Sequence, residues 1–532
     1  MTAGVIADAR DRPDARARAR AVEALVWGLP GVLTLVAALA LLDRRSLWQD
    51  ELATLSATSR PFPDMLRLLT HSDAVLAPYY TLLHGWVRVA GESPVALRLP
   101  SALAMAAAVA VGARCARVLL GRAAGLATGL VLLATPSTLL YAMQARAYAL
   151  TALLATLATA AFVAVLTRPD RRRWLAYAVV VACLGLTQVT ALSLVAAHAA
   201  VVLALPRLWP DRDAAAVRRG LALACVPALL AAAPLLLAGH LQSRQIAWIP
   251  RPGPGTIALL PAEVSGVRVL GAWWIAIAAC AVAAVTIRAR GRQRGGGESE
   301  AGAEAADAVP VGVAVLLGLA VALVPVLVIG VVSLVTPVSL ARYLLFTSWG
   351  WAFLVGGVLA HVTRQGVRQG SRAARIVPAT TVAVVLGVGA VLGVPGWREV
   401  GARTLLAQPD FRLLAAPLRE HARPGDAIVV PTARGKRFRV GLKAYLDGAA
   451  WPEDVLVRED AVAAESLDAH ECEPATCLGR PARLWVACYG GCGDPLSGLS
   501  PPTRAVIRHE GYRAVQRWRG GNAAITLMVA PD

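Results

Sequence analysis

The sequence predicts a polytopic, all-α membrane domain of about eleven transmembrane helices, followed by a small C-terminal α/β domain. Hydrophobic residues make up 57% of the 532 residues and charged residues only 16%. A soluble core cannot bury so much apolar surface, whereas a bilayer can accept it. The apolar residues form long runs separated by short basic clusters, and only the last part of the chain alternates shorter strand-like and helical segments.

The net charge of +19 has a distribution that argues against a nucleic-acid partner. Arg and Lys lie in short blocks between apolar runs rather than on a basic face interleaved with aromatic residues. Such blocks are typical of membrane proteins, in which basic connections stay in the cytoplasm.

The chain begins with an Arg-rich segment, residues 1–21, which we expect to be cytoplasmic. A first apolar helix follows at about 22–42. The triplet Ala38–Ala40 resembles a signal-peptidase site, so a cleaved signal peptide is the alternative interpretation. The apolar run is long for a signal peptide, which favours a retained signal anchor.

Basic connections separate stretches that are each long enough for two crossings. Placing them all in the cytoplasm makes the last helix, at about 376–395, end outside. The membrane domain is then 22–395, and residues 396–532 are an extracytoplasmic domain. Residues 288–308 contain a Gly-, Glu- and Ala-rich stretch typical of a disordered cytoplasmic linker. The basic connections are residues 114–122, 167–174, 207–219, 288–294 and 361–375.

Residues 74–91 lie within the first outer loop, about 43–97, and do not fit this alternation. The segment is apolar but short and contains Pro78, His84 and Arg88. A true span here would reverse the orientation of everything that follows. We therefore expect a re-entrant or interfacial helix at the outer surface, with a true span as the alternative.

The C-terminal domain contains alternating strand-like and helical patterns. Helices are expected at Phe411–His421 and near Lys443–Leu446. Strands are expected at Asp426–Pro431, Ala482–Tyr489 and Ala523–Ala530.

Four cysteines cluster in this domain, as expected for either two disulfides or a tetrathiolate metal site. An extracytoplasmic, oxidising location favours disulfides. Three pairings are possible, and Cys472–Cys477 with Cys488–Cys492 is the local one.

Few ionisable residues lie within the expected spans, which argues against a proton-coupled transporter. Polar residues gather instead at the outer ends of the helices. Asp50 and Glu51 directly follow Trp48 after the first span. Asp50 could simply cap a short helix that starts near Glu51. A carboxylate at a partly desolvated membrane mouth could instead act as a general base toward an acceptor hydroxyl.

The same outer loop contains His71 and Asp73, followed by Tyr79. They could be ordinary loop residues, or a second acid that orients the acceptor or holds a metal. Arg98 opens the next span. It could extend to the interface, anchor the acidic loop by charge pairing, or contact a phosphate.

Further basic and aromatic side chains occupy other outer turns. Arg146 with Tyr148, and Arg342 with Tyr343, suit a lipid-linked phosphate because guanidinium groups bind phosphate oxygens bidentately. Extension to the interface is the alternative for each arginine. A third outer loop contributes amide, guanidinium and indole groups that suit a sugar or an ordinary interfacial belt. These groups belong to Gln242, Arg244 and Trp248.

The order of these features resembles a known superfamily. The Asp50–Glu51 pair after the first helix is followed by PYYTLLHGW, GESPVALRLPSAL, YAMQARAYAL and ARYLL. Together they are similar to the GT-C membrane glycosyltransferases, in the family 39 branch of protein O-mannosyltransferases and aminoarabinose transferases. The resemblance covers roughly residues 22–400 and rests on order and spacing rather than on a single specific motif.

The resemblance implies a polyprenyl-phosphate-linked sugar donor and inverting transfer of mannose or a similar hexose to an acceptor hydroxyl at the outer face of the membrane. It implies Asp50 as the general base with Glu51 in support, and His71 and Asp73 on the acceptor side. Donor phosphate binding would fall to Arg98, Arg146 and Arg342, with the aromatic and amide residues named above as sugar or lipid contacts.

One departure concerns the acceptor. The family's His-Pro-Pro element is replaced by Leu76-Ala77-Pro78, so a protein and a glycan or glycolipid both stay open as acceptors. No cofactor is expected to be required, although Asp50 and Asp73 could hold a divalent cation. The alternative functions are a polyprenol-linked lipid flippase without transferase chemistry and a membrane scaffold whose exported domain binds a partner.

Overall fold

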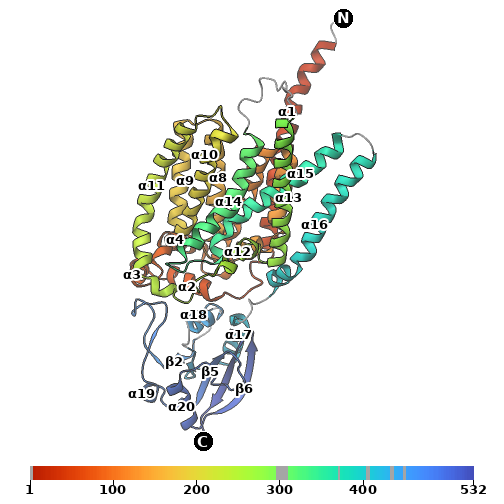
Figure 1. The fold of residues 1–532 in the computed structure, drawn as a ribbon. Helices are drawn as coiled ribbons and strands as arrows, with labels where there is room; N and C mark the ends of the chain where they lie inside the picture. Colours follow the sequence, from red (N-terminus) through yellow and green to blue (C-terminus); the bar gives the residue numbers. More distant parts are fainter. Residues whose placement is uncertain are drawn as a thin grey trace. The chain divides into compact units, whose positions relative to one another are not determined.

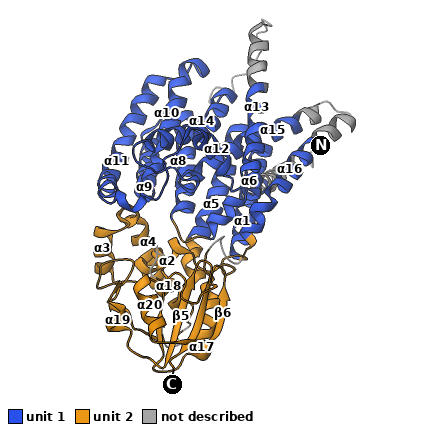
Figure 2. Cartoon of the chain, turned by 60° about the horizontal axis from the view of Figure 1, so that its bottom comes forward, with its two compact units in different colours: residues 1–39, 101–143, 147–400 blue, residues 40–100, 144–146, 401–532 orange. Residues whose placement is uncertain are grey.

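The structure is a computed structural model of the whole chain. It describes residues 4–294, 309–368, 372–402, 408–431, 437–446, 448 and 451–531. The chain folds into two compact units, drawn in blue and orange in Figure 2. Unit 1 comprises residues 1–39, 101–143 and 147–400. Unit 2 comprises residues 40–100, 144–146 and 401–532.

Unit 1 is helical throughout its described part (Figure 1). Three short 3-10 segments connect its helices: η2 (Val189–Leu192), η3 (Ser243–Ile246) and η5 (Ala341–Thr347). Its α-helices, one of which begins in unit 2 at Pro94, are α1 (Gly4–Leu39), α5 (Pro94–Leu120), α6 (Arg122–Ala134), α7 (Pro136–Ala142), α8 (Tyr148–Thr167), α9 (Arg171–Thr187), α10 (Ser193–Leu208), α11 (Ala214–Leu241), α12 (Pro254–Glu263), α13 (Arg268–Arg294), α14 (Val311–Val332), α15 (Ser348–Arg368) and α16 (Arg372–Gly401).

Aspartates cap two of these helices at basic connections. The Asp170 carboxylate accepts a hydrogen bond from the Arg173 amide at the start of α9. Asp213 accepts one from the Ala216 amide at the start of α11. Each cap satisfies an amide that the helix itself leaves unpaired, so these turns begin their helices at defined residues.

The helices that qualify as membrane spans can be compared with the expected number. Among the described residues, eight helices are long and apolar enough to cross a membrane, or up to ten if each of two bent pairs is one span. The sequence predicted about eleven. The remaining helix in the predicted order is α9, which at 17 residues is shorter than these eight.

The two bent pairs break at residues that interrupt a helix. The pair α6 and α7 bends by 67°, and α7 begins at Pro136, which has no amide proton to continue the hydrogen bonding of α6. The pair α12 and α13 bends by 85°, and Gly266 lies between them with φ of +86°. That φ is accessible to glycine and strained for most other residues.

The helices of unit 1 pack through small residues and leave apolar side chains exposed. A Cβ added to Gly356 of α15 would lie 2.4 Å from Thr128 Oγ1 of α6, so glycine permits this close approach. Along α11, Leu223 and Leu230 are 73% and 70% exposed. Such exposed apolar faces are stable in lipid, and the chain is a multi-pass membrane protein.

Unit 2 combines segments that are far apart in the sequence. Its helices are α2 (Gln49–Thr58), α3 (Phe62–His71), η1 (Ala74–Leu76), α4 (Ala77–Ala90), α17 (Phe411–His421), α18 (Phe438–Lys443), α19 (Pro474–Cys477) and α20 (Pro501–His509). Its strands are β1 (Ala427–Val429), β2 (Glu453–Asp454), β3 (Val457–Glu459), β4 (His470–Glu471), β5 (Arg483–Tyr489), β6 (Arg513–Gly520) and β7 (Ala523–Val529).

A five-stranded sheet in the order β2-β1-β5-β7-β6 confirms the small C-terminal sheet region. Strand β1 pairs in parallel with β2 and β5, whereas β7 pairs antiparallel with β5 and β6. Strands β3 and β4 form a separate antiparallel pair. The helix expected near Lys443–Leu446 instead begins at Phe438 and ends at Lys443. The sequence analysis missed β6.

The segment at 74–91 forms η1 and α4. At 14 residues, α4 is not among the helices that qualify as spans, and its length of about 21 Å is less than the hydrocarbon thickness of a bilayer. Tyr79, Tyr80, Leu83 and Val87 are buried on one face of α4. This spacing is typical of a helix that packs one face against the rest of its unit.

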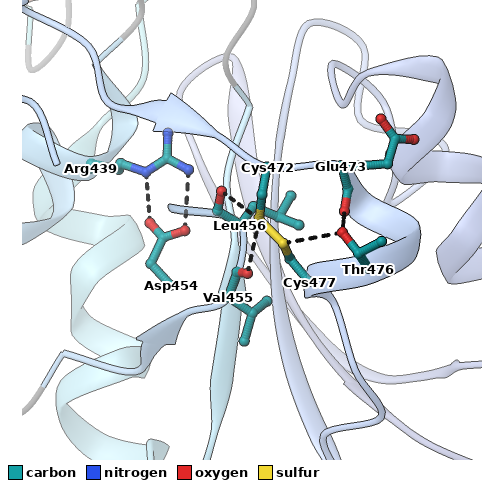
Figure 3. Close-up of a disulfide and its surroundings, with 8 residues drawn as sticks. All are labelled: Arg439, Asp454, Val455, Leu456, Cys472, Glu473, Thr476 and Cys477. Carbon is teal, nitrogen blue, oxygen red and sulfur yellow. Dashed lines mark hydrogen bonds and ion pairs between the residues drawn. A yellow bond between two sulfur atoms is a disulfide. The ribbon is translucent and has the colours of Figure 1, made fainter. Parts of the chain in front are cut away.

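Both disulfides of unit 2 are local: Cys472 bonds to Cys477, and Cys488 to Cys492. Figure 3 shows the first of them close to the ion pair of Arg439 with Asp454.

Two expected boundaries differ in detail. Helix α16 continues to Gly401, beyond the boundary expected at 395, and α1 contains most of the Arg-rich segment 1–21. Most of the expected linker at 288–308 lies outside the described residues, and α13 continues to Arg294.

Candidate active site

The centre of the candidate site is a buried ion pair in unit 2. Glu51 lies in the first turn of α2 and Arg98 in the first part of α5, and their side chains are each only 1% exposed. Arg98 Nε and Nη2 donate to the two carboxylate oxygens of Glu51 at 2.7 Å each. This bidentate geometry is the strongest form of such a pair, and its burial makes the loss of either partner costly.

Arg98 also anchors the segment that follows α1. Its Nη1 donates to the carbonyl oxygens of Leu42 at 2.7 Å and Arg45 at 2.8 Å, and its Nη2 to that of Ser46 at 3.3 Å. A guanidinium has five N–H groups, and these five contacts use them all. The expected phosphate-binding role does not fit this geometry, because no N–H is left for a phosphate. The alternative role, anchoring the acidic loop, does fit.

Glu51 joins three segments of the chain. Besides Arg98, its carboxylate accepts hydrogen bonds from the Ala145 amide at 2.9 Å and the Trp48 amide at 3.3 Å. The Trp48 contact closes the start of α2, and the Ala145 contact fixes the short segment 144–146. A carboxylate with this many donors holds its neighbours in position, and the supporting role of Glu51 in catalysis stays a prediction.

Asp50 has a different environment. It is half-buried, and within the described part of the chain its carboxylate has no hydrogen-bond or ion-pair partner. Helix α2 begins at Gln49 with Trp48 as its N-cap, so Asp50 is not the helix cap. A carboxylate in the first turn is stabilised by the helix dipole. The contacts of Asp50 among the described residues are thus made by its backbone carbonyl, and its carboxylate is available for chemistry.

A second acid is connected to Asp50 through two side chains. Tyr80 Oη donates to Asp73 Oδ2 at 2.9 Å, and Arg146 Nη1 donates to Tyr80 Oη at 3.3 Å. The same Arg146 nitrogen lies 3.4 Å from the Asp50 carbonyl oxygen and 3.5 Å from Thr54 Oγ1. Burial and the charge of Asp73 raise the pKa of Tyr80 well above its ordinary value, so the phenol stays protonated as a donor.

Sequence reasoning missed two residues of this site. Tyr80 lies in the PYYTLLHGW segment, in which only its neighbour Tyr79 was expected to contact sugar or lipid. Arg437, from the C-terminal segment, donates from Nη1 to the Gln49 carbonyl oxygen at 3.3 Å, one residue before Asp50. No local pattern marks Arg437, because its importance comes from a contact across 388 positions.

The C-terminal segment also holds the first loop directly. The Leu47 amide donates to Tyr445 Oη at 2.9 Å, and the Phe411 amide donates to Ser46 Oγ at 3.0 Å. His71 makes a different contact. Its Nε2 lies 3.0 Å from Glu465 Oε2, and both side chains are largely exposed. The described contacts therefore do not place His71 in the network of Asp50, Tyr80 and Asp73.

A separate aromatic cluster lies in unit 1. The Arg342 guanidinium carbon lies 5.6 Å from the ring centroid of Trp248 and 5.7 Å from that of Tyr343. Tyr343 in turn lies 6.2 Å from Tyr148, centroid to centroid. This cluster brings together three residues expected to contact sugar or lipid and Arg342, which was expected to bind the donor phosphate. Gln242 is half-buried after the last residue of α11, and Arg244 is exposed in η3.

Among the described residues, no group of three or more His, Cys, Asp or Glu side chains could hold a metal ion. A cation between Asp50 and Asp73 stays a prediction. What the geometry provides is an unpaired carboxylate beside a fixed cationic and phenolic network, an arrangement suited to accepting a proton from a hydroxyl.

Comparisons with known proteins show which folds this chain resembles. A family model described as dolichyl-phosphate-mannose-protein mannosyltransferase matches residues 75–237. None of the curated proteins matches the chain. The crystal structure of ArnT from Cupriavidus metallidurans bound to undecaprenyl phosphate aligns with a TM-score of 0.54 at 15% identity, over 94% of this chain and 97% of that chain.

Two further structures are similar. ArnT in the apo state has a TM-score of 0.55 at 15% identity, with the same coverage of 94% and 97%. The oligosaccharyltransferase AglB from Archaeoglobus fulgidus, in complex with an inhibitory peptide and a dolichol-phosphate, has a TM-score of 0.48 at 11% identity. That alignment covers 83% of this chain and 64% of that one. At these identities, the ArnT alignments establish a shared fold over nearly the whole chain.

Proposed function

We propose that the chain is a GT-C membrane glycosyltransferase, because its fold is shared with ArnT and a mannosyltransferase family model matches residues 75–237. In this proposal it transfers a sugar from a polyprenyl-phosphate-linked donor to an acceptor hydroxyl. Asp50 is the general base in this proposal. The single observation that carries it is the half-buried Asp50 carboxylate, which has no partner within the described residues although Glu51, beside it, is fully bonded.

The donor class is supported by what the similar proteins bind. The ArnT structure contains undecaprenyl phosphate, and the description of the matching family names dolichyl-phosphate-mannose. Mannose or a similar hexose is accordingly the sugar we propose. The acceptor is a hydroxyl of a protein, a glycan or a glycolipid.

The proposed reaction is a single displacement. The acceptor oxygen attacks the anomeric carbon while the bond from that carbon to the phosphate oxygen breaks, and the acceptor proton passes to Asp50. One displacement inverts the anomeric configuration. A phosphate leaves with little need for protonation, so one base suffices, in contrast to the carboxylate pair of glycoside hydrolases.

Arg146 and Arg342 are the phosphate-binding residues in this proposal. Arg146 is already held next to the Asp50 backbone and Tyr80, and Arg342 lies between two aromatic rings in unit 1. A fixed positive charge stabilises the negative charge that develops on the leaving phosphate. Arg98 is not included, because its N–H groups are all used within the protein.

We further propose a cytoplasmic N-terminus and an extracytoplasmic C-terminal segment. The alternation of basic and less basic connections supports this orientation. The two disulfides support it as well, because disulfides persist in oxidising compartments.

Mass spectrometry and a lipid assay together test the proposed activity. A strain that lacks the protein should lose one hexose from a defined glycan or glycoprotein. The purified protein in nanodiscs should release polyprenyl phosphate from polyprenyl-phosphate-mannose as the hexose appears on that acceptor. Movement of labelled donor across vesicles with no change in its chemistry would contradict the proposal and indicate a flippase.

A further inference from the structure

Unit 2 contains a cavity of about 590 Å³ that the proposed transfer chemistry does not use. Its walls come from the end of α2 and the turn to α3, from α18, and from the segment between β2 and β4. The volume is within the range of small-molecule binding sites, roughly 300–1,000 Å³.

Arg60 is the most informative residue of this cavity. Its residue exposure is 3%, yet its Nη1 has no hydrogen-bond partner within the described part of the chain. Its Nε donates to the Ser56 carbonyl oxygen at 3.0 Å, and Nη2 donates to the Ser466 carbonyl oxygen. Burial lowers the pKa of Arg60, and the charges of Asp460 and Asp64 only partly offset this effect. A buried N–H without a partner is costly, and an oxygen atom of a ligand would satisfy it.

The cavity also presents an acceptor and an aromatic ring. The Asp468 carboxylate is exposed and has no partner among the described residues, and the Lys443 ammonium lies 5.2 Å from the centroid of the Trp451 ring. Arg439, by contrast, is paired with both Asp454 and Glu471. Among the described residues, the lining thus combines an unsatisfied donor, an unsatisfied acceptor and an aromatic side chain.

These groups suit a saccharide. A sugar hydroxyl is both a donor and an acceptor, so one type of ligand group can satisfy both Arg60 and Asp468. An aromatic side chain such as Trp451 offers apolar area to the C–H face of a sugar ring while its polar end stays hydrated.

A polypeptide fits this cavity less well. Peptides commonly bind by adding a strand to a sheet edge or by placing an apolar face in a groove. The edge strand at this cavity, β2, has only two residues, Glu453 and Asp454. Seven of the 19 lining residues carry a charged side chain, so the cavity is not a continuous apolar groove.

The cavity lies along the helix that carries Asp50. Ser59 lines the cavity just after α2, nine positions beyond Asp50, which corresponds to about 14 Å of helix. Arg437 lines the cavity and also contacts the Gln49 carbonyl oxygen beside Asp50. A ligand that extends over more than one sugar residue can therefore occupy the cavity while its end reaches Asp50.

We propose that this cavity binds the saccharide part of the acceptor, so that the acceptor is an oligosaccharide or a glycan-bearing molecule rather than a bare polypeptide. The inference rests on the proposed transferase function, because it names the acceptor class of that reaction.

The test measures binding separately from catalysis. The full-length protein in detergent micelles is titrated by calorimetry with α-linked mannotetraose, with chitotetraose, and with a serine-containing peptide of similar length. We expect at least one tetrasaccharide to bind and the peptide not to bind. Arg60→Gln, Lys443→Gln and Asp468→Asn should each weaken that binding by about tenfold. Lys443 and Asp468 are exposed, so their variants remain informative if Arg60→Gln folds poorly.

Controls and transfer assays separate the two proposals. Arg513→Gln, on the exposed face of β6, should bind the tetrasaccharide as the unaltered protein does. In transfer assays, the cavity variants should raise the KM for the tetrasaccharide and leave the rate with a monosaccharide acceptor unchanged. Peptide binding without tetrasaccharide binding, or unchanged affinity in all three variants, would overturn the inference. Tetrasaccharide binding that the variants weaken, without any transfer, would support the cavity site and contradict the transferase function.

Discussion

Two neighbouring acids, Asp50 and Glu51, lie in different environments in the same turn of α2. Glu51 is buried and accepts hydrogen bonds from Arg98, Ala145 and Trp48, whereas Asp50 is half-buried and its carboxylate is unpaired among the described residues. The sequence predicted this pair as the centre of the site. Only the resemblance to the GT-C enzymes assigned the two residues different roles. Residue pattern alone could not, because adjacent helical residues point in directions about 100° apart and the packing around them decides which is buried.

The buried pair of Glu51 and Arg98 leads to a first prediction. Glu51→Gln or Arg98→Gln should destabilise the protein by about 3–5 kcal/mol, because each leaves an uncompensated buried charge. Arg98→Lys should also be destabilising, since an ammonium cannot form the same five hydrogen bonds. Thermal unfolding in detergent measures the effect. Asp64→Asn, at an exposed ion pair with Arg67, is the matched control and should cost less than about 1 kcal/mol.

Tyr80 gives a second prediction at the residue scale. Tyr80→Phe removes the hydroxyl that joins Asp73 to Arg146, so both side chains should lose their fixed positions. We expect the transfer rate to fall roughly ten- to hundredfold and donor binding to weaken as well, because Arg146 is a proposed phosphate-binding residue. Tyr512→Phe is the control, because within the described part of the chain its hydroxyl bonds only to the Pro481 carbonyl oxygen. Equal rates for the two variants would contradict a positioning role for Tyr80.

At the scale of elements, regular apolar patterns were predictable and contacts between distant segments were not. The bounds expected for α17, Phe411–His421, agree with the structure because Asp410 caps its start and its apolar residues repeat at helical spacing. Strand β6 was missed because its sequence, RAVQRWRG, carries three arginines and faces outward at most positions. Pairing with β7 stabilises it, which its own composition does not indicate.

The sheet contains a buried carboxylate that predicts a pH dependence of stability. Burial alone would raise the pKa of Asp426, but hydrogen bonds from Arg483 and Trp485, each 2.8 Å, and from the Arg423 amide lower it below its ordinary value. This contribution to stability is therefore fully present above the pKa of the unfolded chain, about 3.9. It is lost as the pH falls through the lower pKa of the folded state.

Asp426→Asn should therefore lower stability by about 1–3 kcal/mol at neutral pH. The difference between the variant and the unaltered protein should shrink as the pH falls below about 4. Unfolding temperatures of the full chain measured from pH 7 down to pH 3 provide the test. A difference that stays constant over this range would show that the ionised form of Asp426 is not what stabilises the sheet.

At the scale of the whole molecule, hydropathy alone predicted a multi-pass helical domain and a C-terminal sheet. Hydropathy does not fix the number of spans, because the bends at Pro136 and Gly266 divide two apolar runs into helix pairs. It also does not show that α4 is too short to cross. The grouping of residues 40–100 with 401–532 was not foreseen. It depends on contacts such as Leu47 to Tyr445, which no local pattern encodes.

The proposed orientation can be tested on the intact chain. A reporter that is active only in an oxidising compartment should be active when fused after residue 531 and inactive when fused before residue 4. The alternation of basic connections and the two disulfides lead to this expectation. The opposite pattern would place the candidate site in the cytoplasm and contradict the proposed orientation.

The central claim is that Asp50 is the base of a sugar-transfer reaction, and one substitution tests it most directly. Asp50→Asn preserves the size of the side chain but cannot accept the proton, so the transfer rate should fall by about 10²–10⁴-fold. Glu92→Gln, at an exposed position before α5, is the control and should retain full activity.

The decisive measurement is transfer from polyprenyl-phosphate-mannose by the two purified variants in nanodiscs, with donor binding measured in parallel. The account predicts that Asp50→Asn binds donor normally and forms almost no product. Full product formation by Asp50→Asn would contradict it.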